Sequence, residues 1–576
     1  MQLSTKIASR GHFFAKTTAN ALVAWPVKLT YFANCSIIAK VNLQNNFWVA
    51  WATPLQRRNF LKTEALQSDK MRHTSIGKLL LQMSLPAIFS MLVQALYNVV
   101  DSLFVANITE SIFAGNYTGP ITSLGDDSMT AINIIFPMTT FVTAIAVGIG
   151  VGANAYIARK LGEGNREKAS QAAKTAVVMV LCAWAVLFVL AFTITKPFVS
   201  IFVNENNVAD INYVTDQAVL YVTMYMACSI GQLLDIVFAR ILQATGNMKV
   251  PMISQLVGAL TNIALDALFI VAFKLGVFGA ILATVVGQWA AAAINILAFV
   301  FKKQDVSLSF KGFKLEGKYF SRILRVGTPA LIMNAMGSII TIILNLILNK
   351  YDFNMGKNVL SAYFKVQSFI FMPVFGLMQG TMPILSYNYG ANQKKRFNQT
   401  FKLALSIALG VMCVGTVLFQ AIPETLMSIF ESQIPADGQT MEELMAQNKL
   451  LVESGAYAFR VISIAFIPAA FSILVINMLQ SINSPISSLL MSLCRQLIFL
   501  IPSAFLFDHL WQTKGIWFCY PFAEVCALLM FLPFAIRAYR KQFAYKQAQY
   551  DKNMFDVNVQ NDVQVSTTAD TTVVAE

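Results

Sequence analysis

Charged residues are scarce in this sequence of 576 residues, because Asp, Glu, Lys and Arg together make up only 12% of it. Soluble globular domains carry about 25%. Most of the chain must therefore lie in a solvent that does not tolerate charge, namely a lipid bilayer. In a bilayer only helices or closed barrels satisfy every backbone polar group. The apolar runs here are long and continuous, which predicts helices.

Residues that commonly bind metals are also few. Only three histidines occur, His12, His73 and His509, and none lies in the middle of an apolar run. The seven cysteines show no C-x-x-C spacing, and six of them lie in apolar segments. This pattern indicates reduced, packed thiols. We therefore expect no metal site, no haem and no other cofactor.

The formal net charge of +14 could suggest nucleic acid as a partner, but the basic residues gather in alternate loops. They follow the second, fourth, sixth, eighth and twelfth apolar runs: Arg159, Lys160, Arg166 and Lys168; Arg240 and Lys249; Lys302 to Arg325; Lys394 to Arg396; Arg537, Arg540 and Lys541. The other loops carry mostly acids. This alternation follows the positive-inside rule. We expect a multi-pass protein of the inner (plasma) membrane with both termini cytoplasmic, and no nucleic-acid partner.

Twelve apolar runs from Ile76 onward approach the length of about 20 residues that a spanning helix needs. They lie at roughly 79–105, 129–157, 172–195, 214–239, 251–272, 277–301, 321–349, 359–387, 399–421, 452–479, 485–507 and 515–537. The predicted fold is an all-α membrane protein with twelve transmembrane helices in two pseudo-symmetric six-helix lobes. The predicted lobes are residues 71–301 and 321–545, joined by a cytoplasmic linker at 302–320.

Both ends of the chain differ from this pattern. In residues 1–70, the best apolar stretch is Ala21–Phe32, which is interrupted by a proline and a lysine and is too short to span. We expect a poorly ordered extension there, or a gene start placed too early, since Met71 begins an ordinary membrane-protein sequence. Residues 546–576 are rich in Asp, Asn, Gln and Thr, which predicts a disordered cytoplasmic tail.

The two halves repeat one another. Three glycines of the second run recur 228 residues later in the eighth: Gly148, Gly152 and Gly162 match Gly376, Gly380 and Gly390. The first and seventh runs match as LLLQMSLPAI and RILRVGTPAL, and the fourth and tenth both contain a tyrosine and end in Leu-Gln. Six spans in each half make the repeats parallel. This is the plan of a secondary transporter whose lobes rock about a central site.

Two acids lie inside apolar runs, Asp101 in the first and Asp266 in the fifth. A carboxylate at membrane depth costs about 2.5–3.5 kcal/mol, so it faces a cavity or a partner. Tyr97 and Asn262 each precede an acid by four residues, on the same helix face. Two buried acids at similar depth do not both ionise easily, so the pair could exchange a proton or a small cation. The alternative is a pair satisfied by amides such as Asn98 or Asn262.

Other polar positions allow two interpretations each. Asp235 and Arg240, near the end of the fourth run, look more like an interfacial pair, or capping charges, than a site. Glu524 in the twelfth run is a secondary candidate, although Arg495 of the eleventh run could simply neutralise it. Pro86 marks either the first turn of a helix or a kink at which that helix bends.

The chain from about Met71 to Lys541 resembles the multidrug and toxic compound extrusion (MATE) family, in its DinF-like branch. The resemblance rests on five segments: SLPAIFSMLVQALYNVVDSLFV, GVGANAYIARKLGEGNREKA, LQATGN, TNIALD and GVFGAILATVVGQ. It implies twelve spans in two lobes. It also implies export of small, cationic amphipathic molecules in exchange for H⁺ or Na⁺, by a monomer in the lipid bilayer.

The resemblance also implies a coupling site in the amino-terminal lobe. Its motif positions fall on Tyr97, Asp101, Tyr221, Asn262, Asp266 and Thr284. The kinkable proline of that branch falls on Pro86, which would act as a hinge. The NorM-like branch also uses acids on spans seven and ten, and neither run contains an acid in this sequence. That departure favours coupling through the amino-terminal lobe and leaves H⁺ and Na⁺ both open.

Two rival functions belong to other classes. A lipid-linked saccharide flippase of the same superfamily would carry basic residues in its cavity to grip pyrophosphate. Mid-span bases are few here, mainly Arg460 and Arg495, whereas acids prevail in the first lobe. A membrane-embedded enzyme would need a nucleophile or metal constellation such as H-E-x-x-H, and the sequence contains none. We therefore expect a transporter and not an enzyme.

Overall fold

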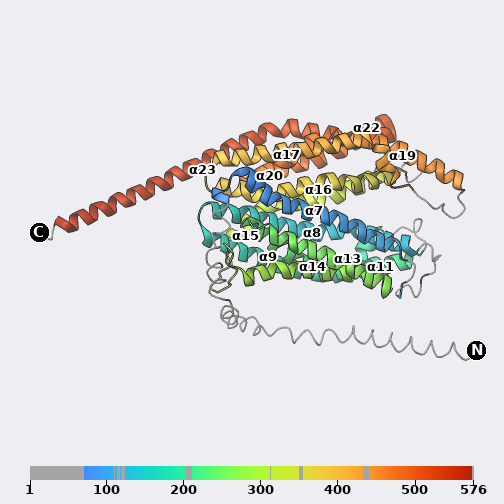
Figure 1. Ribbon diagram of the computed structural model, residues 1–576, viewed down its shortest axis with the longest axis horizontal. Coiled ribbons are helices and arrows are strands. Elements are labelled where there is room, and N and C mark those ends of the chain that lie inside the picture. The colour runs from blue at the N-terminus through green and yellow to red at the C-terminus, as the bar shows by residue number, and fades with distance from the viewer. Residues whose placement is uncertain are drawn as a thin grey trace, which may run out of the picture. The chain divides into compact units, whose positions relative to one another are not determined.

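The computed structural model describes most of the chain and is almost entirely helical where it does so (Figure 1). The described residues are 71–108, 111–112, 117, 124–202, 210–311, 313–348, 355–431 and 440–573. The extension expected at residues 1–70 lies outside them.

The first half contains the helices that hold the predicted site. They are α7 Ile76–Ala106, α8 Leu124–Gly162, α9 Arg166–Thr193, α10 Thr195–Phe202, α11 Ile211–Ala227, α12 Ile230–Ala244, α13 Lys249–Asp266, the π-helix η5 Ala267–Ala272, and α14 Gly276–Phe301.

The second half repeats this order after a linker. Its helices are α15 Gly317–Leu348, α16 Met355–Gly390, α17 Lys394–Ala421, α18 Pro423–Ser428, α19 Met441–Ser463, α20 Phe466–Ser481, α21 Pro485–Leu493, the π-helix η6 Cys494–Leu500, α22 Ile501–Gly515, the short 3₁₀ helix η7 Ile516–Phe518, and α23 Cys519–Val573.

Ten of the described helices are long and apolar enough to cross a membrane, and the number rises to twelve if each of two bent pairs forms one span. The pairs are α11–α12, bent by 45°, and α19–α20, bent by 48°. They correspond to the predicted fourth and tenth spans, so the two halves share the same break. The predicted all-helical membrane fold is confirmed, with two of its spans broken.

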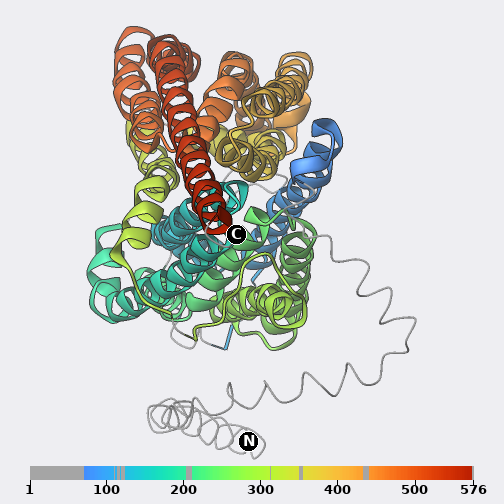
Figure 2. The ribbon, with the colours of Figure 1, turned by 90° about the vertical axis from the view of Figure 1, so that its left-hand side faces the viewer.

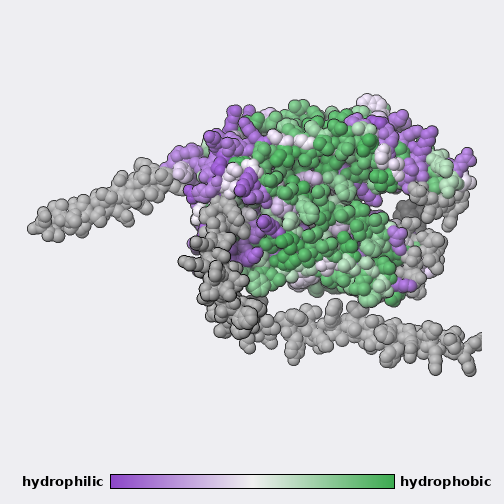
Figure 3. Space-filling model, in the orientation of Figure 1, coloured by the Kyte–Doolittle hydropathy of each residue, from purple (hydrophilic) through white to green (hydrophobic). Residues whose placement is uncertain are grey.

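A broad hydrophobic band covers the sides of the helices between more polar ends (Figure 3). On α9, for example, Val186, Val189 and Phe192 expose 59%, 60% and 65% of their surface. In water such a band would be an aggregation hazard. In a bilayer these side chains meet acyl chains instead.

Each half packs its first helix against the other half. Figure 2 shows α7–α14 grouped on one side and α16–α23 on the other, with α7 and α15 along the seam. α7 packs chiefly on α16, and α15 packs chiefly on α8. The repeat found in the sequence thus becomes a pair of matching crossings between the halves.

Glycine makes the crossing of α8 and α15 possible. A Cβ atom added at Gly152 would lie within 3.0 Å of the carbonyl oxygen of Ile323, and one added at Gly327 would meet the carbonyl oxygen of Gly148 as closely. Real Cβ atoms essentially never come so near. The two backbones are therefore in direct contact, as small residues allow between membrane helices.

The crossing of α7 and α16 uses the repeated glycines in the same way. A Cβ at Gly376 would lie 2.5 Å from the Cα of Ile88, and a Cβ at Gly380 would lie 2.6 Å from the Cα of Ser84. The glycines that repeat after 228 residues are thus the ones that the two crossings require.

The turns α8–α9 and α16–α17 define what we call the basic end of the bundle, at the left in Figure 1. Here Glu163 pairs with Lys160 at 2.5 Å and with Lys546 of α23 at 2.7 Å. Burial opposes the charge of Glu163, but both lysines outweigh it and hold the pKa of this carboxyl below its usual range. The pairs stabilise the fold above the ordinary carboxyl pKa, and this contribution disappears as pH falls through the lowered value.

The end of the chain differs from the expected disordered tail. α23 continues as one helix to Val573. The sequence contains no glycine after Gly515 and no proline after Pro533, so no helix-breaking residue interrupts the α23 backbone after that proline. The polar composition of 546–573 lowers the number of packing partners but does not prevent a helix.

We expect Gly152→Ala to destabilise the protein by about 1–3 kcal/mol, because overpacking at a backbone contact forces the helices apart. Gly410→Ala in α17 is the matched control, since a Cβ there meets nothing within 4 Å. Thermal unfolding of the purified protein should show a lower midpoint for the first variant only. Equal midpoints for both variants would contradict the contact.

Candidate ion-coupling site

The structure brings the two predicted acids together. Asp101 lies on α7, and Asp266 is the last residue of α13, directly before the π-helical segment η5. Asp266 is fully buried and Asp101 half-buried. Their carboxyl groups lie close enough to interact directly. Because ionised carboxylates only accept hydrogen bonds, a hydrogen bond between the two groups needs one proton.

Asn262 and Thr284 adjoin the acids. Asn262 donates through Nδ2 to Thr284 Oγ1 at 3.3 Å. Turning its amide satisfies both ends of the group, because Asn262 then donates to Asp266 Oδ2 at 3.3 Å and accepts from the backbone N–H of Thr284 at 3.2 Å. The amide is thus held between α14 and the acid. Asn98, the other amide considered from sequence, is exposed.

The two predicted tyrosines complete the group. Tyr221 of α11 forms a side-chain hydrogen bond with Thr284, and Tyr97 lies within electrostatic range of both Asp101 and Asp266. The six residues named from the resemblance therefore converge from four helices, α7, α11, α13 and α14.

Sequence reasoning missed a chain of neutral polar residues beside this cluster. Tyr225 donates to Gln232 Oε1 at 2.9 Å, and Gln232 Nε2 donates to Thr143 Oγ1 at 3.0 Å. Two features of the sequence could have pointed to this chain: Tyr225 lies one helical turn after Tyr221, and Gln232 lies just after the break between α11 and α12. Such residues are hard to distinguish from packing residues without the fold.

A cavity of about 120 Å³ connects these groups. Its lining comes from α7, α12, α13 and α14: Ser90, Gln94, Tyr97, Gln232, Asp235, Ile236, Gln255, Gly258, Ala259, Asn262, Thr284, Gly287, Gln288 and Ala291. The lining is mainly amide and hydroxyl groups, with one carboxylate. No lysine, arginine or histidine is among these lining residues.

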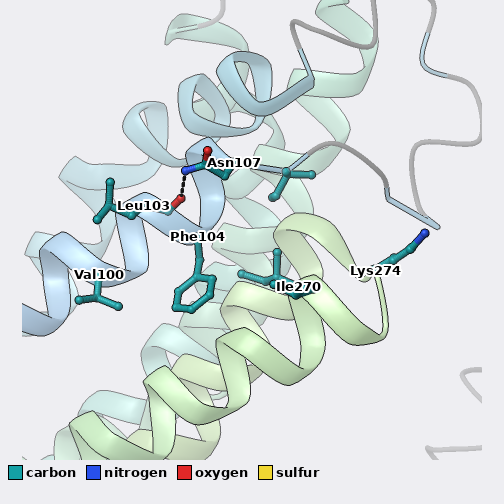
Figure 4. A pocket seen from close by; sticks show the side chains of 8 residues that line it. Val100, Leu103, Phe104, Asn107, Ile270 and Lys274 are labelled. Atoms are coloured by element: carbon teal, nitrogen blue, oxygen red, sulfur yellow. Dashed lines mark hydrogen bonds between the residues drawn. The ribbon is translucent and has the colours of Figure 1, made fainter. Parts of the chain in front are cut away.

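A second cavity, of about 480 Å³, lies at the other side of the acids (Figure 4). It is mostly apolar and is lined by Val100, Leu103, Phe104, Asn107, Ile108, Ile270, Val271 and Lys274. Val100 directly precedes one acid, and Ile270 follows the other by one helical turn. The acid pair therefore lies between a polar cavity and an apolar one.

The expected association of Asp235 with Arg240 is wrong. Asp235 Oδ1 accepts from Asn295 Nδ2 at 2.7 Å, whereas Arg240 Nη1 donates to Gln243 Oε1 at 3.3 Å. Five residues along an α-helix place two side chains about 140° apart, on different faces. Asp235 therefore faces the cavity, which the sequence interpretation did not foresee.

Pro86 lies inside α7, which begins ten residues earlier at Ile76. The first-turn explanation is therefore wrong. Proline removes the hydrogen bond to the carbonyl of Gln82, four residues before. The adjoining Ile88 lies at the glycine crossing with Gly376, so the weakened turn is next to the contact between the halves.

Glu524 forms an ion pair in the second half. Arg495 Nη1 donates to Glu524 Oε1 at 2.9 Å, and the two side chains expose only 13% and 14% of their surface. Arg495 therefore neutralises Glu524, which was one of the two alternatives. A role for Glu524 in coupling stays a prediction.

The MatE family model matches residues 86–268 and 329–506, one stretch in each half. Together these make up more than half of the chain, so the chain belongs to the MatE family. The family's members are transporters, and the chain is a multi-pass membrane transporter rather than an enzyme.

Individual relatives are distant but cover nearly the whole fold. An FAD transporter of Shewanella oneidensis is 23% identical, over 78% of this chain and 92% of its own. The multidrug export protein MepA of Staphylococcus haemolyticus is 23% identical, over 81% and 94%. A solved outward-facing multidrug resistance MATE family transporter of the MOP superfamily shares the fold, with a TM-score of 0.72, 20% identity, and coverage of 83% and 98%.

We expect Glu524→Gln to destabilise the protein by about 3–5 kcal/mol, because it leaves the charge of Arg495 buried and unpaired. Glu424→Gln is the matched control, since Glu424 pairs with Arg460 where both side chains are about half exposed. Denaturation in detergent should separate the two variants. A midpoint unchanged in both would show that the buried pair contributes no stability.

Proposed function

We propose that this protein exports small, cationic amphipathic molecules by antiport against H⁺ or Na⁺, with the Asp101–Asp266 pair as the coupling site. The observation that carries the proposal is the pair of neighbouring, interacting carboxyl groups inside the first lobe. Such a pair holds one proton or one small cation at a time. The name of the MepA relative supports multidrug export.

Coupling would follow from the charge of the pair. With a proton or Na⁺ bound, the two carboxyl groups stay in contact and α7 remains joined to α13. When the ion leaves, two carboxylates repel each other in a medium that screens charge poorly. The outer part of α7 would then move away from α13, which opens the first lobe for cargo.

The lobes would alternate about the glycine crossings. We propose that the basic end faces the cytoplasm, which puts both termini there and the protein in the inner (plasma) membrane as a monomer. The crossings and the Glu163–Lys546 pair support a closed cytoplasmic side in this conformation. Release of these contacts would accompany opening to the cytoplasm.

Anionic cargo is the second candidate, because one relative is an FAD transporter. A phosphate-bearing cargo, or the lipid-linked saccharide of a flippase, needs basic residues to bind it. The described lining of the cavity that contains Asp235 has one acid and no base. We therefore favour cationic cargo.

We expect Asp101→Asn and Asp266→Asn each to abolish gradient-driven efflux, because neither remaining acid can hold an exchangeable ion alone. Efflux from proteoliposomes should be measured with proton and sodium gradients imposed separately, which also identifies the ion. Asp216→Asn, outside this site, controls for the loss of an acid in the same lobe. Normal efflux by both site variants would refute the pair as the coupling site.

We also propose that Pro86 is a hinge through which the pair moves α7. Pro86→Ala restores a straight helix, so we expect turnover to fall several-fold while cargo affinity stays the same. Pro329→Ala, at the matching place in α15, should have a smaller effect because α15 carries no acid. Equal effects of the two substitutions on turnover would mean that Pro86 has no special link to the acids.

A further inference from the structure

Asp235 is a carboxylate without a basic partner at one end of the polar cavity. No described lysine, arginine or histidine forms an ion pair with it, and its contacts are with Asn295. An ionised carboxylate enclosed by helices is costly unless a positive charge or several hydrogen bonds compensate it. Asp235 is therefore poised to bind a cation.

Neighbouring groups hold this carboxylate in place. Asn295 is fully buried and donates both to Asp235 Oδ1, at 2.7 Å, and to Ser254 Oγ, at 2.9 Å. The amide oxygen of Asn295 is buried and accepts no hydrogen bond.

The position of Asp235 separates it from the coupling pair. Ser254, which shares Asn295 with Asp235, precedes Asp266 by twelve residues of α13. At 1.5 Å per residue this is about 18 Å along the helix. The cavity joins the two levels, since its lining includes both Asp235 and Asn262, the neighbour of Asp266. Asp235 is the one carboxylate in this lining, and Asn262 connects the lining to Asp266.

The wall between them accepts hydrogen bonds but carries no positive charge. Gln94, Gln232, Gln255 and Gln288 all line the cavity. Amide oxygens and hydroxyl groups can solvate an organic cation as it moves, and none of them repels it. The described lining contains no basic residue that would compete for Asp235.

We propose that Asp235 binds the positively charged nitrogen of the cargo, at a subsite distinct from the Asp101–Asp266 pair. The inference rests on the proposed function, which supplies the cationic cargo class. Cargo and coupling ion would then use different carboxylates. The protein could hold the cargo at Asp235 while the Asp101–Asp266 pair holds the coupling ion. Cargo and coupling ion would then not compete for the same acid during exchange.

The test is binding of ethidium to the purified full-length protein in detergent, followed by its fluorescence. We expect Asp235→Asn to weaken binding at least about tenfold, or about 1.4 kcal/mol, and Asp235→Glu to restore most of it. Ser254→Ala alters the same hydrogen-bond network without removing charge, and it should bind as the wild type does. Asp216→Asn, which removes an acid outside this cavity, should retain binding.

Two results would overturn the inference. The first is that Asp235→Asn binds ethidium as well as the wild type does. The second is that Asp235→Asn loses binding, Asp235→Glu does not restore it, and Ser254→Ala causes the same loss. The proposed function fails differently: the wild type itself would not bind ethidium, or its efflux would ignore both ion gradients.

Discussion

Direct backbone contact at two helix crossings is the constraint on which the rest of this transporter depends. Where α8 meets α15 and α7 meets α16, a single added carbon at Gly152 or Gly380 would collide with backbone atoms. The crossings therefore fix the spacing of the two halves at the basic end. Because each half contributes its first helix to a crossing, a movement of α7 or α15 displaces contacts with both halves.

This arrangement explains why the acids lie where they do. α7 carries Asp101 towards the end opposite the crossing, so that α7 links the ion site to the contact between the halves. Pro86 weakens the helix at the crossing itself, since Ser84 and Ile88 on either side of it lie against Gly380 and Gly376. In the proposed mechanism, an ion held between Asp101 and Asp266 acts on the lobes through one helix, and no chemistry beyond loss of one charge is needed. The second half contains instead the neutralised pair of Arg495 and Glu524.

Much of the fold could be predicted from the sequence, because a bilayer demands long apolar runs and direct contact demands glycine. The repeated glycines, such as Gly148 and Gly376, revealed the repeat in the sequence. They recur because the helix crossings need glycine for backbone contact. The acid pair was predictable too, since charge at membrane depth is rare. The bends in the fourth and tenth spans, the helical course of 546–573 and the partner of Asp235 were not predictable. The bends and the partner of Asp235 depend on packing between segments far apart in sequence, such as the contact of Asn295 with Asp235. At 546–573 the polar composition outweighed, in the prediction, the lack of helix-breaking residues.

Rocking of the lobes about the crossings is tested most directly by distances between spin labels in liposomes. One pair of labels would replace Lys168 and Lys395 at the basic end, and a second pair would replace Lys274 and Thr425 at the opposite end. Distances would be compared with the coupling ion present and absent. The account predicts that one distance lengthens while the other shortens, and that Asp101→Asn abolishes the response. Distances that stay constant, or that change in the same direction at both ends, would contradict it.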